Sequence, residues 1–354
     1  MGRRVVAGVD EPGARNRVGV TSDDRLRVAL DLDGSLESLG NSMIDLSAAL
    51  ETTGACDLVR FRSESRAQAG EARLTLRPLW LPLWRTGRGV AIDSLLTDVD
   101  VVHVAGRATP PTKRVPLVIS VDDLRPLRGE GHHYLRVSQL RRAVERGAML
   151  VASTRRAGHE VQEVLGVDAS RVAVVPPAVP TVRGVEVGHD LVLNVTGLVE
   201  PPLAMLPSLV RFAHAHDANV VVVASESFHQ RVRPLDLHVT LRTRREAREA
   251  LENARVVLHM SDGARFPSFA IAALAAGVPT MARATSINRE LLSGAAALFD
   301  DDEEVLATLE EVWERGPRRA LMIAAGRDRA GDFAPAEAAN AYLALYREVV
   351  RANT

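Results

Sequence analysis

One segment, from Leu258 to Pro279, constrains the fold more than any other part of this 354-residue chain. A short apolar run ends near Met260, a polar turn Ser261-Asp262-Gly263 follows, and a helix of small residues then stops at Gly277. A strand, a turn, a helix and a glycine stop make up half of a parallel βαβ unit. The carboxyl end of such a strand faces the crevice where open α/β sheets bind ligands. The segment therefore predicts both a fold class and the location of a site.

The same alternation of short apolar runs and helical stretches recurs along most of the chain. The strands expected in the first half are Leu26–Leu32, Asp57–Phe61, Asp100–Val104, Pro116–Val121, Ala148–Ala152 and Val172–Val175. Those expected in the second half are Leu191–Val195, Val220–Ala224, His238–Leu241, Val256–Met260, Thr280–Ala282 and Ala296–Phe299. The clearest helices are Asn41–Leu50, His133–Arg146, Arg156–Leu165, Ala204–His214, Arg244–Asn253, Phe266–Ala276, Asn288–Leu292 and Glu303–Glu314. This rhythm predicts an α/β protein with two parallel, helix-covered sheets.

A proline cluster, Pro176–Pro180, interrupts the rhythm and is typical of an interdomain linker. We therefore expect an N-terminal extension over residues 1–24, a first lobe over 25–182 and a second lobe over 183–334. Two amphipathic helices, Pro317–Arg329 and Pro335–Arg351, end the chain. The last one, within residues 335–354, either completes the first lobe or packs on its own lobe, and the sequence leaves both placements open.

Composition and charge exclude several classes of protein. The content of 46% hydrophobic and 25% charged residues is typical of a soluble globular protein. The net charge of -1 gives no reason to expect a nucleic-acid partner. A single cysteine, Cys56, excludes an intrachain disulfide and a cysteine-based zinc site, and the histidines lack carboxylates at useful spacing. Neither a signal-like segment nor an apolar run long enough to span a membrane is present. We expect a cytoplasmic protein without a metal or cofactor.

The segment after the polar turn closely resembles the donor-site signature of family 4 retaining glycosyltransferases, which have the GT-B fold. In that signature the turn carries Glu-Gly-Phe, a second Glu follows after seven intervening residues, and the helix ends in Ala-Ala-Gly-Val-Pro. The residues that fit without a gap are Phe266, Pro267, Ala273, Ala275, Ala276, Gly277, Val278 and Pro279. Other segments that resemble the family are Leu26–Asp31 with Leu39-Gly40-Asn41, Asp100–His103, Leu117–Leu124, Val172–Val179, Gly294–Asp302 and Ala324–Phe333. The resemblance, over about Arg25 to Arg351, implies two Rossmann-like lobes with a crevice between them.

The residues that carry the chemistry in this family are replaced. The two signature glutamates are Ala264 and Ala272 here, and the donor-contacting histidine is Asp122. Pro177-Ala178 stands in place of Asn-Gly, and Val199–Met205 lacks the Arg/Lys pair that neutralises the donor diphosphate. Each lost charge-assisted hydrogen bond costs about 1.5–3 kcal/mol. Transfer with a diphosphate leaving group depends on stabilising the departing charge, so both binding and chemistry should be weakened.

No catalytic residue is therefore predicted, and the resemblance implies only substrate-binding positions, which are Gly40, Asp122, Arg265, Phe266 and Ser286. Arg265 replaces a glycine near the N-terminus of the signature helix, where a phosphate would naturally bind. It could be a solvated surface residue, fill the pocket, form an ion pair or supply the missing cation, and the same alternatives are open for Arg283 and Arg289.

Two functions remain open. The favoured one is a non-catalytic or impaired homologue that acts as a partner or scaffold for a paralogous glycosyltransferase or glycan-assembly protein. The alternative is an active enzyme that transfers a hexose from a nucleotide-sugar with a divergent donor-binding mode. The segment Trp80-Leu81-Pro82-Leu83-Trp84 has cationic flanks. It is compatible with an acceptor loop, a partner surface, a loop folded onto its own lobe, or peripheral contact with the inner face of a membrane through Trp80 and Trp84.

Overall fold

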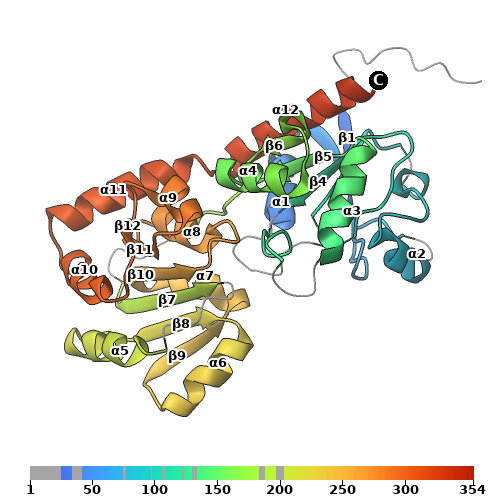
Figure 1. The fold of residues 1–354 in the computed structure, drawn as a ribbon. Helices are drawn as coiled ribbons and strands as arrows, with labels where there is room; N and C mark the ends of the chain where they lie inside the picture. The colour runs from blue at the N-terminus through green and yellow to red at the C-terminus, as the bar shows by residue number, and fades with distance from the viewer. Residues whose placement is uncertain are drawn as a thin grey trace, which may run out of the picture.

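The computed structural model describes residues 25–33, 42–74, 77–96, 98–105, 108–121, 123–129, 134–182, 188–196 and 203–354. Within these residues the chain forms two six-stranded parallel sheets with helices packed against them (Figure 1). The strand order is β2-β1-β3-β4-β5-β6 in the first sheet and β12-β11-β10-β7-β8-β9 in the second. The predicted fold class, two Rossmann-like α/β lobes, is confirmed.

The first sheet follows the predicted pattern closely. Its strands are β1 (Leu26–Asp31), β2 (Cys56–Phe61), β3 (Val101–Val104), β4 (Leu117–Val121), β5 (Met149–Ala152) and β6 (Val172–Val174). The helices between them are α1 (Ser42–Thr53), α2 (Arg77–Trp84), α3 (Tyr134–Glu145) and α4 (Arg155–Leu165), with 3₁₀ turns η1 (Ile92–Ser94) and η2 (Ala169–Arg171). Thr154 begins α4 by accepting a hydrogen bond from Ala157 N, and Gly166 ends it at a φ of 63°.

The second sheet repeats the arrangement. Its strands are β7 (Asp190–Thr196), β8 (Val220–Ala224), β9 (Val239–Thr243), β10 (Ala254–Ser261), β11 (Thr280–Arg283) and β12 (Ala297–Phe299). Its helices are α5 (Leu206–Ala215), α6 (Glu226–Val232), α7 (Ala247–Glu252), α8 (Ser268–Ala275), α9 (Ser286–Leu292) and α10 (Glu304–Trp313), with 3₁₀ turns η3 (Arg233–Leu235) and η4 (Arg244–Glu246). Helix α6 was not predicted from the sequence. Ser225 caps it by accepting a hydrogen bond from Phe228 N.

Two helices, α11 (Pro317–Gly331) and α12 (Pro335–Asn353), complete the chain. Helix α11 packs against α8 of the second lobe, whereas α12 packs against α1 and β3 of the first (Figure 1). The buried face of α12 includes Tyr342, Leu343 and Tyr346, which belong to one apolar cluster with residues of α1 and β1. Of the two placements that the sequence left open, the structure therefore has the one on the first lobe.

A buried polar network fixes α12 to the first sheet. The Nδ1 atom of His103 lies 2.7 Å from the Tyr346 hydroxyl, and its Nε2 atom lies 2.9 Å from Ser120 Oγ. Complete burial lowers the pKa of His103 to about 3, so the ring is neutral at physiological pH. A neutral imidazole with a partner on each nitrogen satisfies its hydrogen bonding without burying a charge.

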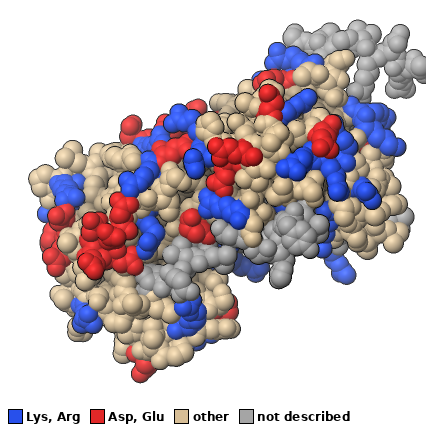
Figure 2. All heavy atoms as spheres, viewed as in Figure 1, with Lys and Arg blue, Asp and Glu red and all other residues tan. Residues whose placement is uncertain are grey.

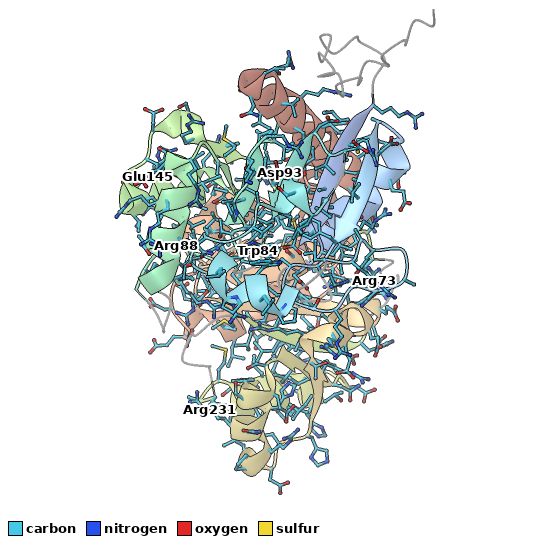
Figure 3. All side chains as sticks on the ribbon, turned by 90° about the vertical axis from the view of Figure 1, so that its right-hand side faces the viewer. Arg73, Trp84, Arg88, Asp93, Glu145 and Arg231 are labelled. Atoms are coloured by element: carbon cyan, nitrogen blue, oxygen red, sulfur yellow. The ribbon has the colours of Figure 1, made fainter. Side chains whose placement is uncertain are left out.

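The segment from Trp80 to Trp84 is a helix, α2, rather than a loop. Trp84 is fully buried, and its indole N–H donates a hydrogen bond to the Val90 carbonyl at 2.9 Å. The expected surface contact through Trp84 is therefore wrong for this structure, because its ring is enclosed inside the first lobe (Figure 3). The exposed apolar side chains of α2 are instead Leu79 and Leu83. Among the described residues, no helix combines the length and the apolarity needed to span a membrane.

Candidate functional site

The site lies at the point where the strand order of the second sheet reverses. Strands β7 and β10 are neighbours in space, although two strands and their helices separate them along the chain. Helices therefore leave this point toward opposite faces of the sheet, and a crevice opens at the carboxyl ends of the strands. The signature turn follows the carboxyl end of β10, as the sequence predicted.

The signature turn has the expected conformation. Buried alanines, however, occupy the two positions at which the resemblance implies glutamates. Gly263 has a φ of 66°, and a Cβ atom there would lie 2.9 Å from Thr285 Cβ, so glycine is required. Asp262 Oδ1 accepts a hydrogen bond from Ala264 N at 2.9 Å. Ala264 and Ala272 are 1% and 0% exposed. The two positions at which the resemblance implies glutamates are thus packed with apolar side chains.

An ion pair joins the turn to the first lobe. Asp123, just after β4, accepts a hydrogen bond from Arg265 Nη2 at 2.9 Å on Oδ2, and Arg125 Nε donates to its Oδ1 at 2.9 Å. Burial alone would raise the pKa of Asp123, but the hydrogen bonds and charges of Arg125 and Arg265 outweigh it and lower the pKa to about 2. The carboxylate is therefore ionised at physiological pH, and Arg265 is engaged with it.

Backbone hydrogen bonds extend this contact. Leu124 N donates to Ala264 O at 2.9 Å, and Asp123 and Arg265 form an antiparallel β-bridge. Arg128, which also pairs with Glu160, donates to Gly263 O at 3.2 Å. Together these bonds tie the loop after β4 to the signature turn. We call this set of contacts the interlobe latch.

The other two candidate cations are also in ion pairs. Arg283 pairs with Asp302, and Arg289 Nη2 lies 2.5 Å from Asp300 Oδ1. All three arginines are therefore in ion pairs, and Arg289 is in addition exposed to solvent. On the face shown in Figure 2, basic and acidic side chains are interspersed where the two lobes meet.

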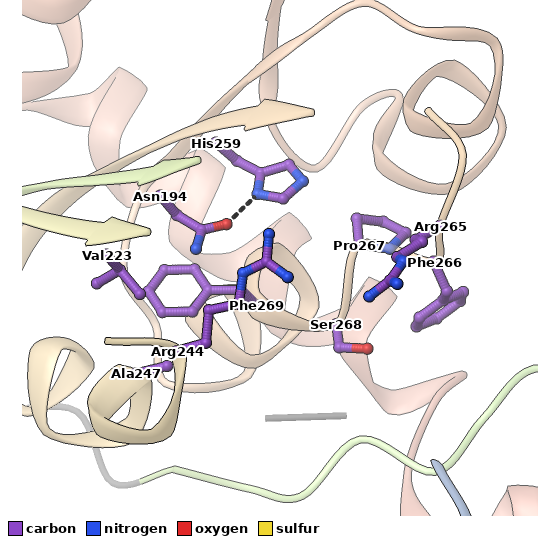
Figure 4. Close-up of a pocket in the computed structure, with 10 residues that line it drawn as sticks. All are labelled: Asn194, Val223, Arg244, Ala247, His259, Arg265, Phe266, Pro267, Ser268 and Phe269. Carbon is purple, nitrogen blue, oxygen red and sulfur yellow. Dashed lines mark hydrogen bonds between the residues drawn. The ribbon is translucent and has the colours of Figure 1, made fainter. Parts of the chain in front are cut away.

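Beside the latch is a small pocket that is open to solvent. Its lining residues are Asn194, Val223, Arg244, Ala247, His259, Arg265, Phe266, Pro267, Ser268 and Phe269 (Figure 4). Of the predicted binding positions, Arg265 and Phe266 therefore come together here. Ser286 is exposed at the start of α9 and does not line the pocket. Gly40 and Asp122 lie outside the described residues.

Four polar residues of the pocket were not singled out from the sequence: Asn194, Arg244, His259 and Ser268. Asn194 Oδ1 lies 2.7 Å from His259 Nδ1, across the pair of strands β7 and β10. Burial lowers the pKa of His259 to about 4, with Asp262 opposing the shift, so this ring is neutral. A sequence signal was available, because both residues interrupt otherwise apolar strands.

Comparisons with known proteins agree with this architecture. Residues 40–183 match the sequence profile of Glycosyltransferase Family 4. The sequence matches no curated protein. Sucrose-phosphate synthase from Thermosynechococcus elongatus superposes with a TM-score of 0.67 and 13% identity, covering 93% of this chain and 100% of that one. HepE from Anabaena, solved with UDP and glucose, gives 0.63 and 14%, covering 92% and 100%.

A third similar structure is AviGT4, a glycosyltransferase involved in avilamycin A biosynthesis, with a TM-score of 0.57, 17% identity and coverage of 92% and 98%. At such low identity these likenesses establish the fold and not the substrate. The fold is therefore the two-lobed GT-B fold, which these glycosyltransferases share. The resemblance to family 4 that the signature suggested is confirmed by the profile over residues 40–183.

Proposed function

We propose that this protein is a non-catalytic or severely impaired GT-B homologue that serves as a partner or scaffold for an active glycosyltransferase or glycan-assembly protein. The observation that carries the proposal is the interlobe latch, in which Asp123 and Arg265 pair across the crevice beside the signature turn. A donor diphosphate would have to displace Asp123 from Arg265.

The missing carboxylates support the same proposal. In this fold family the sugar and ribose are held by side chains at the positions that Ala264 and Ala272 occupy here, and both alanines are buried. A methyl group offers no hydrogen bond to a hydroxyl. The chain thus keeps the backbone of the signature turn and helix, while the two carboxylates are absent and Arg265 is bonded to Asp123.

The test is a binding and transfer assay on the full chain. We expect UDP-glucose, GDP-mannose and other common nucleotide-sugars to bind with a Kd of about 1 mM or weaker, which is about -4 kcal/mol. We also expect no glycosyl transfer, and an increase in transfer when the protein is mixed with its glycosyltransferase partner. Micromolar binding of any of these donors, or turnover by the protein alone, would refute the proposal.

The alternative, an active hexosyltransferase with a divergent donor mode, is favoured by one observation. Arg244 and Arg265 both line the pocket, at the end of the sheet where a nucleotide-sugar would bind. If the protein alone transfers a hexose, the alternative requires that Arg265→Ala abolish most of that turnover, while Arg289→Ala, which removes a surface ion pair, leaves it unchanged.

We also propose a peripheral membrane contact. Because Trp84 is buried, the exposed residues of α2 would make it instead. Leu79 is 60% exposed and Leu83 41% exposed. Arg85 and Arg88 follow the helix and are exposed, and Figure 3 shows Arg88 nearer the edge of the lobe than Trp84. Apolar side chains beside cations are the combination that binds the surface of an anionic bilayer.

A further inference from the structure

A second pocket lies in the first lobe, at the end of the sheet opposite the crevice. The loop before β4, the turn that joins α3 to β5, and the end of α12 form its walls. Leu117, in its wall, is the first residue of β4, whereas the latch residue Asp123 follows the last residue of that strand. Because β3, β4 and β5 are parallel, the pocket is at the amino ends of these strands and the latch is at the carboxyl ends. The pocket is therefore separate from the candidate site.

The pocket is lined by cations and by no carboxylate. Its charged lining residues are Lys113, Arg114 and Arg146. Within the part of the chain that the structure describes, none of the three pairs with an acidic side chain; the two guanidinium groups bond only to carbonyl oxygens. Glu145, which precedes Arg146, is exposed and does not line the pocket. Positive charges that converge on a concave surface without counter-charges attract an anion.

Hydrogen bonds to the backbone hold this arrangement in place. Asp93 is 3% exposed, and its Oδ2 accepts a hydrogen bond from Arg114 N at 2.8 Å, which fixes the loop before β4. Arg114 Nη2 donates to Asp93 O at 3.3 Å, and Arg146 Nη1 donates to Gly87 O at 2.9 Å. A guanidinium group has several N–H donors, so one such bond orients it and leaves other donors for a ligand. Groups that are held in position before a ligand arrives lose less entropy when it binds.

The third cation, Lys113, differs from the other two. It is the only lysine in a chain that otherwise uses arginine for its basic side chains. Lys113 is exposed, and its ammonium group makes no hydrogen bond or ion pair within the described residues. A lysine side chain is a flexible stem with a compact charge, whereas arginine offers a planar fork. Two oriented forks and one flexible ammonium group are suited to an anion with several oxygens.

The enclosed space sets the size of the anion. The pocket encloses about 90 Å³ and is open to solvent on one side. One water molecule needs about 10–15 Å³ on the same scale, so the space holds several waters or one phosphate group. A phosphomonoester carries a charge of about −1.5 to −2 at pH 7, which three cations neutralise. The open side leaves room for the rest of the ligand to remain in solvent.

We propose that this pocket binds a phosphomonoester group, whose oxygens contact Lys113, Arg114 and Arg146. Two sources share this chemistry: a small soluble phosphomonoester, such as glycerol 3-phosphate, and the headgroup of phosphatidic acid in a membrane. The proposal does not depend on the proposed function, because the pocket and the crevice are at opposite ends of the first sheet. A protein that transfers no sugar can therefore still bind this group.

The experiment has one arm for each source and uses the full chain. Calorimetric titration compares glycerol 3-phosphate with glycerol, and cosedimentation compares phosphatidylcholine vesicles with and without phosphatidic acid. We expect the phosphorylated member of at least one pair to bind and the neutral member not to bind, with affinity falling as the salt concentration rises. Binding of glycerol 3-phosphate identifies a soluble ligand; binding of the phosphatidic acid vesicles alone identifies a lipid headgroup.

Two matched variants test the location. Lys113→Ala should weaken binding by about fivefold to tenfold, the loss of one charge-assisted contact at a partly exposed position. Arg66→Ala should leave binding unchanged. Arg66 is also an exposed cation of the first lobe that forms no ion pair among the described residues, but it does not line the pocket.

A further measurement needs no variant. Because the chain has one lysine, selective ¹³C labelling of lysine gives the signals of a single side chain, and these should shift when the ligand is added. The proposal is overturned if neither source binds, if Lys113→Ala and Arg66→Ala have the same effect, or if the lysine signals stay fixed while the ligand binds.

Discussion

Restoring the signature glutamates tests whether the donor site has been abandoned. Ala272 is fully buried in the apolar cluster that α8 shares with neighbouring helices. Its neighbours in the helix from Phe269 to Leu274 are buried as well, so α8 is enclosed on all sides at this position. Ala272→Glu therefore places a larger, ionisable side chain in space that is already filled. Overpacking costs about 1–3 kcal/mol, and burying a polar group without a partner costs about as much again.

We expect Ala272→Glu to lower the free energy of unfolding by about 2–5 kcal/mol, measured by urea denaturation. Ala272→Gln is the matched control, since it has nearly the same size and no charge. Burial would raise the folded-state pKa of the new carboxyl above its unfolded value, near 4.3. The folded state then binds more protons than the unfolded one, so stability falls as the pH rises. The deficit of the Glu variant relative to the Gln variant should therefore be larger at pH 8 than at pH 4.

The double variant Ala264→Glu/Ala272→Glu addresses function. We expect it to remain inert with UDP-glucose and related donors, because Arg265 stays engaged with Asp123 and the Arg/Lys pair is still missing. The assay is glycosyl transfer, with donor binding followed by calorimetry. Substantial transfer by the double variant, against none for the parent, would mean that the rest of the donor site is functional and that our reasoning about the latch is mistaken.

Three further predictions concern other parts of the molecule. Asp123→Asn should lower the free energy of unfolding by about 2 kcal/mol at pH 7. Because the folded-state pKa of about 2 lies below the unfolded value, that difference should shrink as the pH falls below 4 and be mostly lost at pH 2, and a difference that is undiminished at pH 2 would contradict the assignment. Tyr346→Phe should cost about 1–2 kcal/mol in urea denaturation by leaving Nδ1 of buried His103 without its partner, and a neutral result would show that the network does not hold α12. Leu79→Asp should reduce cosedimentation with anionic vesicles, whereas Leu235→Asp, at an apolar residue with 41% exposure on the other lobe, should not; equal effects would remove α2 as the contact.

The strands could be predicted from the sequence alone, because they are short apolar runs with clear ends. Val220–Ala224, for example, is fully buried and has the boundaries that the sequence predicts. Helix α2 was not predicted because Pro82 lies inside it and cannot donate the helical hydrogen bond. Burial of Trp84 outweighs that defect, and burial of this kind is a tertiary property. Helix α6 is short and mostly polar, so its apolar periodicity is too weak to detect.

The candidate site, like the fold, was predictable from the sequence only in part. The location at the end of β10, and the alanines at the positions where the resemblance implies glutamates, follow from local sequence. The pairing of Arg265 with Asp123 does not, since 142 residues separate the two and they meet only when the lobes come together. The pair Asn194 and His259 could be predicted in part. Each residue is visible as a polar interruption of an apolar strand, but their contact depends on the β7–β10 register.

The interlobe latch also bears on how a scaffold differs from an enzyme. In enzymes that close around a substrate, binding drives the closure, so the open state must be accessible without ligand. Here the contacts between the lobes already include a pair of charged side chains, and a second contact forms where Glu290 of α9 accepts hydrogen bonds from Arg155 N and Arg156 N at the start of α4. Each such bond involves a charged group and is worth more than a neutral one. Opening would break them together with no ligand to compensate. The proposed scaffold role requires these contacts to keep the lobes in one arrangement, because a partner would then meet a constant surface.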